Sequence, residues 1–377
     1  MKVLQRYLAS EILRAVVFVL AAFLALFAFF DLTGELKSVG QGGYGLQHVF
    51  LYVLLGMPSY AYMLMPISAL IGTIYALSQL ASRSEFTIMR VSSMSTLMVA
   101  GMLAKIGLLI AFVTFIFGEF ISPFSTQLAD QMKLQAQGAS ISQEFRSGVW
   151  TKDTIKESGL TGAVVGSRFL NVREIRVDGQ LLDVKLYEFD REFHLSALIT
   201  AARGDYQGGK TWRLSDVSET LFDGTVSGTN KQSPVKSSRL ASKDFVSEIT
   251  PDILSVLRAD PDRMSANELA VYTKHLSENK QETERYEIAF WKKIIYPFAV
   301  FVMMALALPF AYLHFRTGGV SLKIFTGIMI GVSFELLNAL FSHLGILNTW
   351  PALATAIAPS ALFFLAAISA LWWVERH

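Results

Sequence analysis

Residues 15–30 read AVVFVLAAFLALFAFF, a run of 16 residues without one polar side chain. The hydrocarbon core of a bilayer is about 30 Å thick, and about 20 apolar helical residues are needed to cross it. Extended to residues 12–32, this run therefore predicts a membrane-spanning helix. Five later segments meet the same criterion, namely residues 52–80, 97–121, 294–313, 324–341 and 352–374. The sequence thus predicts six spans.

The second span contains Pro58 and Pro66 but no charged residue between positions 52 and 80. Proline removes a helical hydrogen bond and clashes with the carbonyl group four residues earlier, which kinks or breaks a helix. Inside a membrane, neighbouring helices must then satisfy the freed backbone groups. We therefore expect the second helix to be kinked or broken.

The first span can also be read as a signal peptide, with Lys2, Arg6 and Arg14 as its basic segment. Its apolar run is at the long end for such a peptide. Residues 29–32 read FFDL and lack the small residues of a cleavage site. We interpret the segment as a retained membrane anchor.

Charged residues are scarce and unevenly placed. They make up 17% of the 377 residues, and the net charge is +2, whereas soluble domains are about 25% charged. These values exclude a nucleic-acid binder, a disordered chain and an ordinary cytosolic enzyme. Of the 33 basic and 31 acidic residues, 21 and 23 lie in residues 125–285. We therefore predict membrane spans one to three in residues 1–124, an inserted polar domain in 125–264, and a short helix with spans four to six in 265–377.

Basic residues in the short loops favour one side of the membrane. Because short loops rich in Lys and Arg stay in the cytoplasm, we predict that both termini are cytoplasmic and that the inserted domain lies on the far side. The short loops on that far side carry only Lys37. The predicted cytoplasmic segments carry Lys2, Arg6, Arg14, Arg83, Arg90, Arg316, Lys323 and Arg376.

The inserted domain has the pattern of β-structure. Residues 183–189 and 211–217 alternate apolar and polar side chains, which is the period of a half-buried strand. Glycine-containing turns recur between such runs, and several short strands with frequent turns predict a sandwich or a jelly roll. Ser265 and Glu268 then form a predicted capping box at the start of a helix that leads back to the membrane.

Residues 204–211 read GDYQGGKT and match the phosphate-binding pattern GxxxxGK[ST]. Such a site needs a strand before the loop and a helix after it, because the N–H groups of the helix bind the phosphate. Residues 212–217 have a strand pattern instead. We therefore predict a hairpin turn here and no nucleotide-binding site.

Residues for other chemistry are sparse. The chain has no Cys, which excludes disulfides, thiolate zinc sites and a Cys nucleophile. Its six His residues are scattered without metal-binding spacing, and no GxSxG motif of a serine hydrolase is present. We predict no catalytic residue, no metal and no cofactor.

Several short motifs, in a fixed order, resemble one family of membrane proteins. They are GQGGY at residues 40–44, RSE at 83–85, GVWTKD at 148–153, RY at 285–286 followed by WKK at 291–293, and TGI at 326–328. Together with the layout of three spans, a β domain and three spans, they make the whole chain similar to the LptF/LptG family of ABC-transporter permeases, and to its LptG branch more than to its LptF branch. The resemblance implies an α-helical membrane protein with six transmembrane helices and an inserted periplasmic β-jelly-roll-like domain.

The resemblance also implies a function and partners. Such a permease subunit extracts lipopolysaccharide from the bacterial inner membrane and passes it to a periplasmic bridge. It works with an LptF-type permease, an LptB-type ATPase dimer and an LptC-type membrane-anchored protein, so ATP hydrolysis belongs to a partner and the chain itself is not an enzyme. Two alternatives stay open: a membrane scaffold that moves no lipid, and an ion-coupled secondary transporter, which would need more carboxylates or broken helices inside the spans.

The loop at residues 82–96 matches the coupling helix of this family, which transmits closure of the ATPase to the spans. Its candidate contacts are the charged Arg83, Glu85 and Arg90 and the apolar Phe86 and Met89. The alternative is an ordinary cytoplasmic loop that follows the positive-inside rule.

Family members carry basic residues after span one that contact the phosphates of the lipid. This sequence departs from that pattern, because Asp31 and Glu35 would repel phosphate and Lys37 is the only base there. Lys292 and Lys293 could share the role, divalent cations could bridge, or the head group could differ. The alternative for all three lysines is snorkelling at the membrane interface.

Glu335 and Asn338 lie three residues apart on one face of the fifth span. A carboxylate inside a membrane is costly and usually faces a cavity or a partner helix. We therefore expect these two residues at a gate or cavity, with Glu335 protonated, hydrogen-bonded to Asn338 or near the interface.

Overall fold

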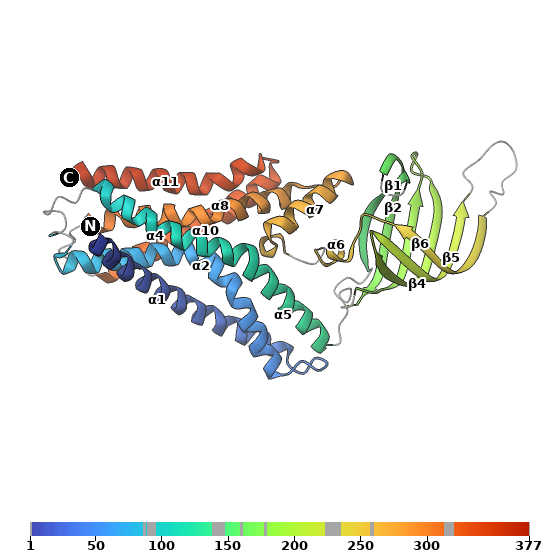
Figure 1. The fold of residues 1–377 in the computed structure, drawn as a ribbon, viewed down its shortest axis with the longest axis horizontal. Helices are drawn as coiled ribbons and strands as arrows, with labels where there is room; N and C mark the ends of the chain where they lie inside the picture. Colours follow the sequence, from blue (N-terminus) through green and yellow to red (C-terminus); the bar gives the residue numbers. More distant parts are fainter. Residues whose placement is uncertain are drawn as a thin grey trace.

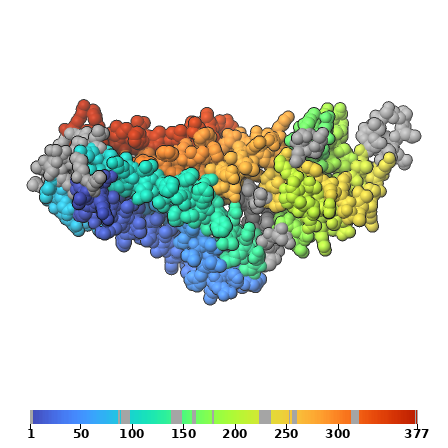
Figure 2. Space-filling view, in the orientation of Figure 1, coloured from blue at the N-terminus to red at the C-terminus, as the bar shows by residue number. Residues whose placement is uncertain are grey.

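A bundle of long helices and a β-sheet domain lie at opposite ends of an elongated molecule (Figure 1). Both termini lie at the end of the bundle farthest from the sheet (Figure 1). In the space-filling view, the chain around residues 35–60 projects to one side of the bundle (Figure 2). The computed structural model describes residues 2–85, 88, 96–137, 148–158, 161–176, 179–222, 235–256, 260–312 and 320–376.

Six helical segments in the described part of the chain are long and apolar enough to cross a membrane. This confirms the six predicted spans. The helices are α1 (Lys2–Glu35), α2 (Leu46–Ser82), α4 (Thr96–Ile116), α8 (Glu284–Ala307), α10 (Val320–Leu347) and α11 (Ala352–Arg376). Since α1, α8 and α10 all pack against α2, α2 is the centre of the bundle. Only 17% of the residues in the most apolar part of α1, and the same share in α10, are buried within this chain.

The second span is a single helix, because α2 runs unbroken through both Pro58 and Pro66. Of the two predicted outcomes, a break is therefore excluded. Helix α2 also lies very close to α1, since a Cβ atom added to Gly72 would come within 2.7 Å of the Val16 backbone. Only glycine allows that approach without a shift of one helix.

The third span extends beyond the apolar segment that predicted it. Helix α4 continues through η2 (Phe117–Ile121), a π-helical turn, into α5 (Ser122–Gln137). A π-helical turn adds one residue to a helical turn and is common at functional sites. Because α5 is polar and packs against α2, the third helix projects its last turns beyond the apolar region.

The inserted domain is one six-stranded antiparallel sheet in which every strand pairs with its neighbour in the chain. A six-helix membrane protein with an inserted β domain is therefore confirmed as the fold class. Arg168 in the second strand donates to the Val246 carbonyl at the end of the last strand, at 3.0 Å, so the sheet curls until its two edges approach. The strands are β1 (Val149–Ser158), β2 (Thr161–Ile175), β3 (Leu181–Phe189), β4 (Leu195–Gly208), β5 (Thr211–Phe222) and β6 (Val235–Val246).

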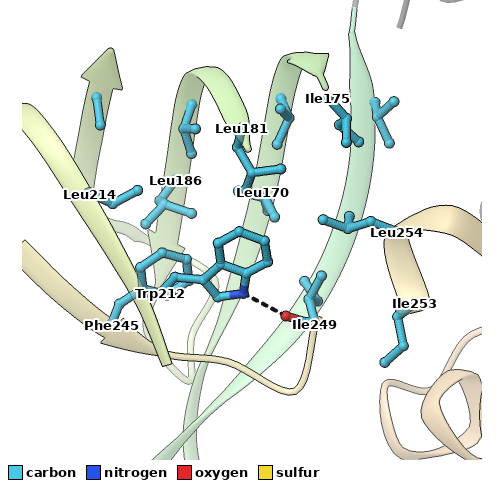
Figure 3. Packing of buried hydrophobic residues seen from close by; sticks show 14 of the residues in the cluster. Leu170, Ile175, Leu181, Leu186, Trp212, Leu214, Phe245, Ile249, Ile253 and Leu254 are labelled. Carbon is cyan, nitrogen blue, oxygen red and sulfur yellow. Dashed lines mark hydrogen bonds between the residues drawn. The ribbon is translucent and has the colours of Figure 1, made fainter. Parts of the chain in front are cut away.

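The core of the β domain is shared with the helices that follow it. Trp212 is fully buried at the centre of this core, and its Nε1 donates to the Ile249 carbonyl at 2.7 Å (Figure 3). Helices α6 (Pro251–Val256) and α7 (Ala266–Glu278) supply further buried side chains, including Leu254 and Leu269. The first turns of α8 join the same cluster through Ala289. The sheet is thus fastened to a membrane helix by shared apolar packing.

The segment GDYQGGKT is the turn between β4 and β5, as predicted. Gly208, Gly209 and Lys210 all adopt positive φ angles, and strand β5 begins directly afterwards. The Lys210 ammonium group pairs with Glu248. Because a strand and not a helix follows the loop, its N–H groups cannot form a phosphate-binding helix terminus.

Candidate functional site

A cavity of about 460 Å³ opens where the end of α1, the first half of α2, α5, α8 and α10 meet. The short helix η4 (Pro261–Arg263), which precedes α7, completes its wall. Six residues that the sequence analysis singled out line this cavity together, namely Asp31, Glu35, Lys292, Lys293, Glu335 and Asn338. Lys37 does not line it, because the chain turns into η1 (Leu36–Ser38) and leaves this side chain exposed.

The two acidic side chains after span one have partners that neutralise or bind them. Lys133 of α5 lies 2.6 Å from Glu35, and the Tyr44 hydroxyl donates to the same carboxylate at 3.0 Å. Asp31 accepts a hydrogen bond from the Tyr60 hydroxyl at 2.9 Å. The charge of Lys133 therefore offsets that of Glu35, whereas the Tyr60 hydroxyl binds Asp31 without neutralising it.

Lys133 was missed by the sequence analysis because it is about 100 residues away from Glu35 in the chain and lies in a polar helix. The neighbouring Tyr44 stays a neutral donor, since burial, its hydrogen bond to Glu35 and the carboxylate charge all raise the pKa of Tyr44 above its usual value. The signal that could have found Lys133 is the continuation of the third helix past the membrane.

Lys293 is the buried cation of the cavity. Only 7% of it is exposed, and its Nζ has no hydrogen-bond partner among the described residues. The ammonium group lies 4.8 Å from the centre of the Tyr62 ring, which gives a cation–π contact. Its neighbour Lys292 instead pairs with Asp262 at 3.1 Å. A buried charge without a counterion is costly, so Lys293 is an unusual residue in this wall.

Glu335 projects from α10 into the same cavity and is bound by Tyr296 of α8. The Tyr296 hydroxyl lies 2.8 Å from Glu335 Oε1 and also contacts the Met63 carbonyl. The hydrogen-bond partner of Glu335 is thus Tyr296, not Asn338 on its own helix. Three membrane helices are joined at this point, because Met63 belongs to α2. This polar connection is the kind that a carboxylate inside a span requires.

The predicted coupling loop begins where α2 ends, at the end of the molecule opposite the β domain (Figure 1). Arg83 follows the helix as an exposed residue, and Ser84 turns the chain with a φ of 61°. Glu85 then accepts a hydrogen bond from the Tyr7 hydroxyl of α1 at 3.0 Å. Phe86, Met89 and Arg90 lie outside the described residues.

Acidic and histidine side chains do not gather into a metal site in the described part of the chain, where no group of three or more could hold an ion. The cavity of the described residues thus contains the buried ammonium group of Lys293 and the carboxyl group of Glu335, which is hydrogen-bonded to Tyr296.

Comparison with known proteins leads to the same family as the sequence motifs. The family model for the lipopolysaccharide export system permease LptF/LptG matches residues 6–374. Lipopolysaccharide export system permease protein LptG of Escherichia coli K12 is 30% identical over 375 residues, which is 99% of this chain and 98% of that protein. The LptG protein of Haemophilus influenzae is 30% identical over 373 residues, with 98% and 97% covered. The chain therefore belongs to the LptF/LptG family of lipopolysaccharide export system permeases.

Proposed function

We propose that this chain is the LptG-type permease subunit of an ABC transporter that extracts lipopolysaccharide from the inner membrane and passes it toward a periplasmic bridge. The observation that carries the proposal is the cavity in which Lys293 is buried without a hydrogen-bond partner among the described residues. Lipopolysaccharide carries phosphate groups on a lipid anchor, so a cation at the membrane edge of a helix-lined cavity matches its chemistry. Membership of the permease family supports the same substrate.

The cavity recognises the head group through Lys293, while Lys292 shapes the same wall. Charge-assisted hydrogen bonds to phosphate are about twice as strong as neutral ones, and the surrounding protein excludes water from Lys293. The ion pair between Lys133 and Glu35 removes the repulsion that Glu35 would otherwise exert. Glu335 and Asn338 line the same cavity from α10, where a change in the packing of that helix would open or close it.

ATP hydrolysis belongs to partner proteins. We assign to them an LptB-type ATPase dimer on the cytoplasmic side, an LptF-type permease beside α1 and α10, and an LptC-type protein near the β domain. The uncovered apolar faces of α1 and α10 suit contact with a second membrane subunit. Residues 82–96 dock on the ATPase, with Arg83 and Glu85 as charged contacts and Phe86, Met89 and Arg90 as the remaining contacts.

An ion-coupled secondary transporter is less compatible with this fold. Such transporters bind their ions at discontinuous helices near the middle of the membrane. The span with two prolines is instead continuous, since α2 runs unbroken over Leu46–Ser82. This feature supports the permease over the ion-coupled alternative.

The chain lies in the inner membrane in this proposal, with cytoplasmic termini and a periplasmic β domain. Both termini lie at one end of the molecule and the sheet at the other (Figure 1), as this arrangement requires. A chain without Cys allows single-cysteine labelling at Phe193, which is exposed in the turn between β3 and β4. Labelling by a membrane-impermeant thiol reagent in intact spheroplasts is expected, and protection would refute the orientation.

The transport function is tested with a photo-crosslinking residue in the cavity. Met63 lines the cavity and is partly exposed, whereas Phe364 of α11 is an exposed control outside it. In proteoliposomes that contain the partner proteins, lipopolysaccharide should crosslink at Met63, and ATP should then move it to the periplasmic bridge protein. Crosslinking that is equal at both positions, or a complex that hydrolyses ATP without releasing lipid, would favour the scaffold instead.

A further inference from the structure

Helix α7 joins the β domain to the membrane helices, and its first turn is bound by a side chain of the third span. Glu119 Oε2 accepts a hydrogen bond from the Ala266 backbone N–H at 2.9 Å, and Glu119 Oε1 accepts one from Asn267 at 3.4 Å. These two N–H groups begin a helix and have no partner within it. A carboxylate is also the charge that the positive end of a helix favours.

The same end of α7 makes a second contact with the third span and also has a capping box of its own. Gln127 of α5 donates to Glu268 at 2.6 Å. Ser265 and Glu268 form the capping box that the sequence predicted, with bonds of 3.2 Å and 2.8 Å. Glu119 therefore binds the first two backbone amides of α7 from another helix. The capping box fixes the position at which α7 begins.

Beyond its first turn, α7 buries one face in the core of the β domain. Leu269, Tyr272 and Leu276 are buried there. Tyr272 also makes an edge-to-face contact with Tyr286 of α8, with ring centres 4.7 Å apart. Because protein cores are close-packed and resist compression, a displacement of α7 moves the sheet with it.

A continuous set of contacts runs from Glu119 back to the cavity. Gly118, its neighbour in η2, has no Cβ, and a Cβ placed there would overlap the Tyr62 ring. That ring lies 4.8 Å from the Lys293 ammonium and 4.9 Å from the Tyr296 ring. Tyr62 thus touches the cation of the cavity on one side and the π-helical turn on the other.

The π-helical turn is the element that would change in the coupling argued below. It contains one residue more per turn than an α-helix, so a return to α-helical bonding would rotate Glu119 about the axis of the third span. A pathway needs such a bistable element in addition to a chain of contacts. Here the element lies between the cavity and α7.

We propose that Glu119 is a positioning residue that couples occupancy of the cavity to the placement of the β domain. An anionic group on Lys293 moves the Tyr62 ring, the ring shifts the turn at Gly118, and Glu119 carries the first turn of α7 and the attached sheet with it. The inference rests on the proposed function, in which that anionic group is a phosphate of lipopolysaccharide.

The contact itself is tested by amide hydrogen exchange of the full chain in nanodiscs. Glu119→Ala removes a charge-assisted acceptor, so exchange at Ala266 and Asn267 should accelerate at least ~10-fold. Glu119→Gln keeps one acceptor oxygen and should give a smaller change. Glu278→Gln, in the last turn of α7, is the matched control and should leave these amides as in the wild type. Unchanged exchange in Glu119→Ala would overturn the contact.

The coupling is tested by the distance between two spin labels. The native chain has no Cys, so labels at Phe193 in the β domain and Leu347 at the end of α10 are unambiguous, and both side chains are exposed. Added lipopolysaccharide should shift this distance in the wild type and in Glu278→Gln but not in Glu119→Ala. A shift in Glu119→Ala equal to that of the wild type would overturn the inference.

A substitution that is measured without added lipid separates this inference from the proposed function. Gly118→Ala places a methyl group against Tyr62 and should shift the label distance on its own, and the shift should vanish when Glu119→Ala is added. If lipopolysaccharide fails to crosslink in the cavity but Gly118→Ala behaves in this way, the coupling stands and the substrate is wrong. If the lipid crosslinks but neither the lipid nor Gly118→Ala moves the label, the coupling is wrong.

Discussion

Replacing Lys293 with methionine should weaken lipid binding and, at the same time, stabilise the folded protein. The two effects have opposite signs because Lys293 is buried and its Nζ has no hydrogen-bond partner among the described residues. Methionine is close to lysine in length and is flexible enough to fill the same space. The substitution therefore removes the charge and leaves the packing nearly intact.

The size of the binding effect follows from the bond that is lost. A hydrogen bond to a charged group contributes about 1.5–3 kcal/mol, which corresponds to a loss of about 10- to 100-fold in lipid affinity. The stability effect follows from desolvation. Burying an ion costs several kcal/mol, whereas the cation–π contact with Tyr62 returns about 2 kcal/mol. We expect Lys293→Met to raise the free energy of unfolding by about 1 kcal/mol or more.

The matched control is Lys292→Met at the neighbouring position. Lys292 pairs with Asp262, whose side chain is 64% exposed, so loss of the pair should change stability by under about 1 kcal/mol. The measurements are lipopolysaccharide binding to the nanodisc-embedded protein and thermal unfolding of both variants. Wild-type lipid affinity in Lys293→Met would refute the assignment of Lys293 as the phosphate contact. A strongly destabilised Lys293→Met would show that the charge has a structural partner.

Charge reversal at the coupling loop, by Arg83→Glu or Glu85→Lys, should sharply lower lipid transfer per ATP, because like charges in a packed contact cost several kcal/mol. Wild-type transfer by both variants would exclude this loop. Lys210→Ala should leave ATPase activity and transfer near wild type, since Lys210 lies in a hairpin turn; a loss of ATPase activity would refute that reading. Burial lowers the pKa of His275, so the unfolded chain binds more protons and the protein should lose stability as the pH falls below about 6.5. His275→Gln should flatten the pH dependence of thermal unfolding, and an unchanged slope would contradict this assignment.

The membrane helices are predictable from sequence because the residues of each span must themselves be apolar enough to lie in the bilayer. Every backbone polar group in the membrane needs a partner within the protein, so a span is read locally from 20 apolar residues. The same reasoning fails for Pro58 and Pro66, since whether a proline breaks a helix depends on the neighbours that pack against it. Helix α2 is the central helix of the bundle, and this environment keeps it continuous.

The cavity is only partly predictable. Lys292, Lys293 and Glu335 attract attention as charges next to apolar sequence, and they do meet in one cavity. Tyr62 carries no such signal, because an aromatic residue in an apolar span is ordinary. Its role depends on lying between Lys293 and Gly118, and these three residues come from three different helices.

The charge of a site cannot be read from the charges nearest to it in the sequence. More carboxylates than cations line this cavity, and a count would predict that it repels phosphate. Two of these carboxylates are paired with cations, Glu35 with Lys133 and Asp262 with Lys292, so the count overstates the negative charge that an incoming group meets. Lys293 is buried without a hydrogen-bond partner among the described residues, and its positive charge is the one that we propose for phosphate. Which charges are paired depends on contacts between distant helices, so the charge of the cavity is a property of the fold more than of the composition.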